Sequence, residues 1–186
     1  MVTTGDKMKV RIVNCPDKDF KPFVERAVEF YAQNLIKSKR LRDNIHLTIK
    51  FNPKITVWAF ASIEDYNASN KAREFLIEIH PWIGAAEIFK TLAHEMVHIK
   101  QFAHGETNET LSKWKGISVD ADAIDYYHHP WELEAYSLEV GLWTKLAIKE
   151  ELWNVFEDIS NPDAPIKKED IKWKYLKDEN STTSNG

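Results

Sequence analysis

The chain has 186 residues, a formal net charge of −4, and 43% apolar against 29% charged residues. These values are typical of one globular domain with a hydrophobic core, and they exclude disordered and fibrous proteins. The acidic balance argues against nucleic-acid binding, and Cys15, as the single cysteine, excludes an intrachain disulfide. The sequence has no signal peptide and no apolar segment long enough to span a membrane, so we expect a cytoplasmic protein that does not bind membranes.

The first half of the chain predicts strands and one helix. Alternating β-branched residues predict a strand over 9–15, and apolar residues at helical spacing predict a helix over 19–38. Two strands follow over 44–52 and 55–63, and their junction at Pro53-Lys54 predicts a hairpin. A further strand is expected over 74–81.

The second half is predominantly helical. A helix is expected from Gly84 to Ala103, then a polar connection over 106–129, then a second helix from Pro130 to about Trp153. We predict a single α+β domain over 1–160, with helices packed against one twisted sheet, and a flexible tail over 161–186.

The first long helix contains HEMVH, which has the HExxH pattern of zinc hydrolases. His94 and His98 lie one turn apart on one helix face, so both imidazoles can bind one ion. Glu95 is placed beside that ion, where its carboxylate can take a proton from water. The polar side of this helix, including Gln101, is predicted to face a cleft. The alternative is a surface helix in which the pattern is accidental.

His104 is the nearest candidate for a third ligand, because the three histidines have the spacing of the metzincin signature HExxHxxGxxH. That signature has a glycine where this chain has Gln101, and glycine allows the sharp turn that returns the third histidine to the metal. An unbroken helix would carry His104 about 9 Å beyond His98. His104-Gly105 is more typical of a helix C-terminus.

The second long helix offers two carboxylates, Glu132 and Glu134, either of which could complete a site of two histidines and one glutamate. They lie about 200° apart around a helix, so only one can bind the same ion. His128 is a further alternative, as a third histidine ligand. His128, His129, Tyr126 or Tyr127 could also stabilise an oxyanion.

HEMVH followed by Glu132-Leu133-Glu134-Ala135 resembles the gluzincin branch of zinc metallopeptidases, and is similar to the minigluzincin, ImmA/IrrE and CAAX-protease cores. The resemblance implies a zincin-like fold with a small, twisted, mostly antiparallel sheet against the active-site helix. It also implies a Zn²⁺ ion bound by His94, His98 and Glu132, although the Glu-Ala-x-Ser pattern of thermolysin would select Glu134. These families have Asp or Asn four residues after the ligand, where this chain has Tyr136. We therefore expect Glu139 or the Tyr136 hydroxyl to orient a ligand histidine.

The function implied by this resemblance is zinc-dependent hydrolysis of peptide bonds by metal-activated water, with Glu95 as the general base and acid. A peptide or protein substrate would pair with an edge strand, either 74–81 or 55–63. The element KWKG (113–116) before PWE is similar to small metallopeptidase-like proteins of tailed phages, which would place the protein in a host cytoplasm. The alternatives are an inactive metal-binding domain with the same fold, an SprT-like protease acting on DNA-bound proteins, and a structural protein without metal.

Overall fold

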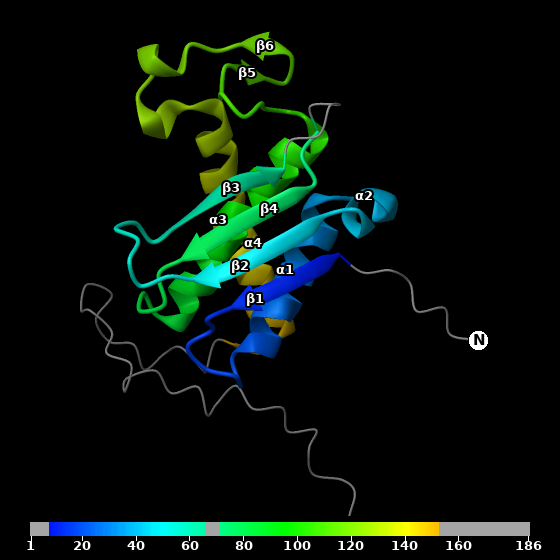
Figure 1. The fold of residues 1–186 in the computed structure, drawn as a ribbon, viewed down its shortest axis with the longest axis vertical. Helices are drawn as coiled ribbons and strands as arrows, with labels where there is room; N and C mark the ends of the chain where they lie inside the picture. Colours follow the sequence, from blue (N-terminus) through cyan, green and yellow to red (C-terminus); the bar gives the residue numbers. More distant parts are fainter. Residues whose placement is uncertain (1–7, 66–70, 153–186) are drawn as a thin grey trace, which may run out of the picture.

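The structure of the chain is a computed structural model that describes residues 8–65 and 71–152 (Figure 1). The predicted tail over 161–186 lies outside the described residues, whereas the second long helix ends at Lys149, before its predicted end near Trp153. Within them, no helix combines the length and the apolar character needed to cross a membrane.

A four-stranded sheet forms one layer of the domain. Its strands are β1 (Lys9–Val13), β2 (His46–Phe51), β3 (Ala59–Asp65) and β4 (Glu74–Ile79), in the spatial order β1-β2-β4-β3. β1 is parallel to β2 and β2 is parallel to β4, whereas β3 is antiparallel to β4. The predicted α+β class is confirmed. The expectation of a mostly antiparallel sheet is wrong, because the helix between β1 and β2 makes the crossover that parallel strands require.

The hairpin predicted between the second and third strands is also wrong. A local turn does form, since the side chain of Asn52 accepts a hydrogen bond from the Lys54 amide at 3.0 Å. However, β3 does not pair with β2, because β4 lies between these two strands in the sheet. β4 is therefore an interior strand, and within residues 8–65 and 71–152 β3 pairs with a strand on one side only, which leaves its other edge free.

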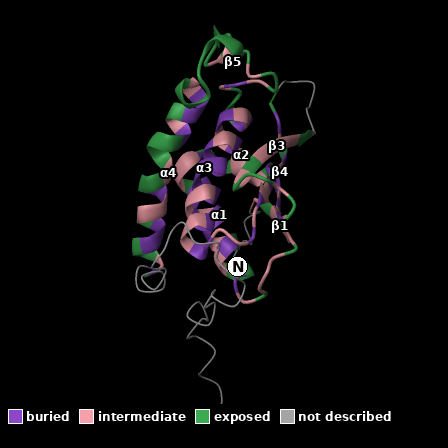
Figure 2. Cartoon of the chain, turned by 90° about the vertical axis from the view of Figure 1, so that its left-hand side faces the viewer, coloured by how far each residue is buried: buried purple, intermediate pink, exposed green. Residues whose placement is uncertain are grey.

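The helices cover one face of the sheet. They are α1 (Lys21–Leu35), α2 (Lys39–Asp43), α3 (Ala85–His104) and α4 (Pro130–Lys149). α1 and α3 pack on the sheet, and α4 packs against α3 on the side away from it (Figure 2). The inward-facing residues of β2 and β4 are almost completely buried beneath them, whereas alternate residues of both strands face outward. The short α2 was not predicted from the sequence; the Ser38 hydroxyl caps it by accepting a hydrogen bond from Leu41.

The connection between α3 and α4 has structure of its own. It contains a two-stranded hairpin, β5 (Lys113–Trp114) and β6 (Ile117–Ser118), and two short 3₁₀ turns, η1 (Ala121–Ala123) and η2 (Tyr126–His128). The second turn leads directly into α4, where Pro130 occupies the first helical turn as predicted. Figure 1 shows this segment above the start of α4.

Candidate metal centre

The helix that carries HEMVH is bounded by two glycines. Gly84 precedes α3 with φ 88°, and Gly105 follows it with φ 70°, a left-handed conformation that ends the helix. Between them α3 lies sandwiched by the sheet and α4, so it is buried on nearly every side. The side predicted to face a cleft is largely covered by α4: Gln101 is fully buried, and only 8% of His94 is exposed.

His94, His98 and Glu132 converge at the contact between α3 and α4. The two Nε2 atoms of the histidines lie 3.1 Å apart. One carboxylate oxygen of Glu132 lies 3.3 Å from His94 Nε2, and the other lies 3.5 Å from His98 Nε2. The structure thus brings together the three residues expected from the sequence as ligands, with ligand atoms all within 4.8 Å of one another.

These residues fit a tetrahedral metal ion. Zinc binds nitrogen and oxygen ligands at about 2.0 Å, so neighbouring ligands of a tetrahedral ion lie about 3.3 Å apart. The two Nε2 atoms are 3.1 Å apart, and each lies 3.3 or 3.5 Å from a different oxygen of the Glu132 carboxylate, which is close to that spacing. One ligand atom from each residue can be chosen so that all three lie within 4.8 Å of one another. In addition, Glu132 Oε2 is buried and accepts no hydrogen bond among the described residues, although His94 Nε2 lies 3.3 Å from it and a buried carboxylate oxygen normally accepts one. The group could therefore hold a divalent cation.

In the absence of metal, the carboxylates around His94 and His98 stabilise the protonated imidazoles, and the imidazoles stabilise the Glu132 carboxylate. Burial lowers the pKa of His94, but the carboxylates of Glu132 and Glu139 outweigh it and raise that pKa to about 9. Burial raises the pKa of Glu132, but the two imidazoles outweigh it and lower that pKa to about 2. The carboxylate therefore carries a negative charge at neutral pH, as a metal ligand requires.

Glu95 lies beside this group without belonging to it. Only 5% of the residue is exposed, and burial raises the pKa of its carboxyl group. The neighbouring histidines lower that pKa, as does a backbone hydrogen bond from Ala61 in β3, but burial is the larger effect. Glu95 thus connects the centre of α3 to the edge strand of the sheet, and its basicity exceeds that of an ordinary carboxylate.

Glu139 orients His94. Its Oε2 atom lies 2.8 Å from His94 Nδ1, which leaves Nε2 of the same ring directed towards Glu132 and His98. Tyr136, at the position where the resembled families have Asp or Asn, packs its ring against His94 at a centroid distance of 4.7 Å. Of the two groups expected from the sequence, Glu139 therefore supplies the polar contact and Tyr136 supplies a ring contact.

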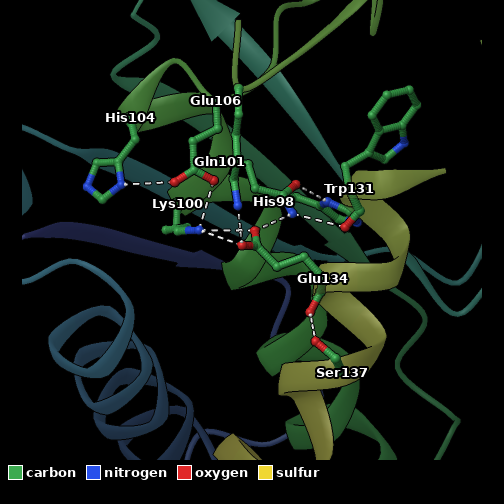
Figure 3. A network of polar contacts seen from close by, with 9 residues as sticks. His98, Lys100, Gln101, His104, Glu106, Trp131, Glu134 and Ser137 are labelled. Atoms are coloured by element: carbon green, nitrogen blue, oxygen red, sulfur yellow. Dashed lines mark hydrogen bonds and ion pairs between the residues drawn. The ribbon is translucent and has the colours of Figure 1, made fainter. Parts of the chain in front are cut away.

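The rival carboxylate, Glu134, faces away from the histidine pair. It accepts hydrogen bonds from Lys100 at 3.0 Å and from the Gln101 amide at 3.0 Å (Figure 3). Lys115 also donates to it at 3.0 Å. Burial raises its pKa, but these three donors outweigh that effect and lower it. Glu134 thus belongs to a hydrogen-bond network with Lys100, Lys115 and Gln101, and it does not share the position of Glu132.

The rival histidines also lie elsewhere. His104 is in the last turn of α3, and its Nδ1 atom lies 3.6 Å from Glu106 (Figure 3). His128 is exposed and lies 3.8 Å from Asp125. His129 Nε2 lies 3.0 Å from the Ala121 carbonyl, and its ring packs on Trp131. None of the three joins the group formed by His94, His98 and Glu132.

The sequence analysis did not predict two sets of contacts near this group, one made by Gln101 and one by Lys100. Gln101 Oε1 lies 2.9 Å from His98 Nδ1, and Lys100 bonds to both Glu134 and Glu106. The spacing of His98 and Gln101, three residues apart on a helix, was the available signal. The sequence analysis places Gln101 on the polar face with the histidines but predicts no contact between Gln101 and His98.

Comparisons of this chain with protein-family models, with curated proteins and with solved structures gave no match.

Proposed function

We propose that this protein is a zinc-dependent metallopeptidase whose zinc ligands are His94, His98 and Glu132. The observation that carries the proposal is the convergence of these three side chains, whose ligand atoms lie within 4.8 Å of one another, with Glu95 adjacent but outside the group. A bound zinc ion would supply a Lewis acid that polarises the scissile carbonyl and acidifies water. Two histidines and one glutamate, with a fourth position left open, are typical of catalytic zinc sites.

Glu95 acts as the proton carrier in this proposal. Its buried carboxylate takes a proton from the attacking water and returns it to the leaving amine, and the raised pKa moves its basicity towards the operating pH. Tyr126 is a second participant: burial, the charge of Glu132 and a hydrogen bond to the Glu132 carboxylate raise the pKa of the Tyr126 hydroxyl, which lies beside the proposed zinc ligand. A hydroxyl at this position can donate a hydrogen bond to a developing oxyanion.

The free edge of β3 is the proposed binding surface for the substrate. β3 ends the sheet, and Ala61 within it contacts Glu95, so an extended peptide paired with this edge would pass beside the reacting groups. The other segment considered from the sequence, 74–81, is excluded as an edge, because β4 pairs on both sides. The proposed substrate is thus a peptide or an extended segment of a protein.

The deciding experiment measures bound metal and peptide hydrolysis for the unaltered protein and for Glu95→Gln. We expect about one zinc per chain in both proteins. Hydrolysis of a quenched fluorescent peptide library should fall by at least about 100-fold in the variant, since it loses the general base. Glu87→Gln, in the first turn of the same helix, is the matched control and should keep full activity.

Each alternative gives a different result. A protein that binds zinc but hydrolyses no peptide of the library would be a metal-binding domain and not an enzyme. A protein that contains no metal after purification and takes up none from solution would overturn the zinc site itself.

A further inference from the structure

We infer that Gln101 is a positioning residue that fixes His98 for metal binding, and that the salt-bridged carboxylate of Glu134 holds Gln101 in place. The inference rests on the proposed zinc site, but it does not depend on peptidase activity. It assigns a role to Gln101, which stands where metzincins have glycine. It also assigns a role to Glu134, the carboxylate that the sequence offers as an alternative to Glu132.

The orientation of the Gln101 amide is determined by its partners. Its Nε2 atom lies 2.9 Å from the Trp131 carbonyl oxygen and 3.0 Å from Glu134 Oε2 (Figure 3). Both partners are acceptors, so the end of the amide that faces them must be the NH₂ group. The amide oxygen is therefore the atom that faces His98.

This orientation determines the protonation of the His98 ring. An amide oxygen can only accept a hydrogen bond, so His98 Nδ1, at 2.9 Å, must carry the proton. The lone pair of the neutral ring then lies on Nε2, the atom that faces His94 and Glu132. Metal-binding histidines generally donate their second nitrogen to such a partner, and losing the partner weakens metal binding.

Glu134 and two lysines hold the amide in this position. Lys100, from α3, and Lys115, from the β5–β6 hairpin, both donate to Glu134 at 3.0 Å. Gln101 is fully buried, so its side chain has little freedom to turn away from His98. The connection between α3 and α4, including the KWKG element, thus reaches the metal centre through Lys115, Glu134 and Gln101.

His94 and His98 are oriented by different means. Glu139 contacts His94 with a carboxylate, whereas a neutral amide contacts His98. A second carboxylate at position 101 would face Glu134, whereas the amide can donate to Glu134 and accept from His98 at once. The ability of the amide to donate and accept at the same time is the physical reason for glutamine at position 101.

The test compares zinc affinity among variants by competition with a chromophoric chelator. Gln101→Met fills the buried position without polar atoms, and we expect its zinc affinity to fall roughly 10- to 100-fold. Gln101→Glu keeps an acceptor for His98, but it loses the donors to Trp131 and Glu134 and places a carboxylate against Glu134, so its zinc affinity should fall as well. Gln33→Met, on the exposed face of α1, is the matched control and should bind zinc as the unaltered protein does.

Thermal unfolding in excess chelator separates folding from metal binding. All four proteins should unfold cooperatively without metal. If Gln101→Met does not fold, Gln101→Asn replaces it, because its shorter side chain cannot reach His98 and the same loss of affinity is expected.

Three results would overturn the inference. Unchanged zinc affinity in Gln101→Met would show that the amide does not position His98. Unchanged zinc affinity in the folded Glu variant would show that the contact with Glu134 does not hold the side chain at position 101 in place. Failure of the unaltered protein to bind zinc would overturn both this inference and the proposed zinc site, whereas zinc binding without hydrolysis would overturn only the peptidase.

Discussion

Tyr126 and Tyr127 are adjacent in the sequence and their rings are in contact, yet their surroundings differ. Burial and the charge of Glu132 raise the pKa of the Tyr126 hydroxyl, whereas the ring of Tyr127 packs against Tyr126 and Tyr136. The pair therefore offers a matched comparison at the scale of single residues.

Tyr126→Phe removes one hydroxyl and leaves the ring contacts in place. If that hydroxyl donates a hydrogen bond to the oxyanion, kcat should fall about 100-fold with little change in KM, since the contact strengthens only in the transition state. Zinc content should not change. Tyr127→Phe should retain nearly full kcat, and an equal loss in both variants would assign the effect to the aromatic surface in general.

At the scale of elements, two glycines have different structural roles: Gly105 ends α3, and Gly141 lies within α4. Gly105 ends α3 at φ 70°, a conformation that costs other residues roughly 1–2 kcal/mol. Gly141 lies within α4, and a Cβ placed there would meet no atom within 4 Å. The same substitution should therefore have opposite effects at the two positions.

Gly105→Ala should lower the free energy of unfolding by about 1 kcal/mol, because its Cβ would meet only the Lys71 side chain at 3.7 Å and the cost is that of the backbone conformation. Gly141→Ala should raise the free energy of unfolding by roughly 0.5–1 kcal/mol through helix propensity. Urea denaturation in chelator measures both. A destabilised Gly141→Ala would mean that the outer face of α4 is not open.

The group that could hold a metal ion lies between α3 and α4. His94 and His98 come from α3 and Glu132 from α4, and the Nε2 atoms of the two histidines and a buried carboxylate oxygen of Glu132 face one another. A cation at this point would join the two helices, because it replaces an unsatisfied contact with three bonds.

For the whole molecule, zinc binding should therefore raise the resistance to unfolding. At a free zinc concentration 100-fold above Kd, the gain is about 2.7 kcal/mol. Thermal unfolding should shift to higher temperature with added zinc and return with chelator. Glu132→Gln should lose most of the shift, whereas Glu109→Gln, in the connection between the helices, should keep it; an equal shift in both would place the zinc elsewhere.

Much of this molecule follows from local sequence patterns. The period of apolar residues predicted β1, α1, α3 and α4 close to their observed bounds, because helices and strands depend on neighbours within a few residues. The HExxH spacing was sufficient to place His94 and His98 on one helix face. The resemblance of the Glu132 region to gluzincins then nominated the third residue of the group.

Tertiary structure alone decided the rest. Strand order depends on which segments meet across the sheet, and the same alternating pattern in β2, β3 and β4 fits a hairpin as well as the observed order. Likewise, Glu132 and Glu134 are equivalent by composition and differ only in what α4 brings them against: the histidine pair for one, Lys100 and Lys115 for the other. Local chemistry sets the helix and its motif, whereas contacts between residues distant in sequence select the carboxylate that completes the site.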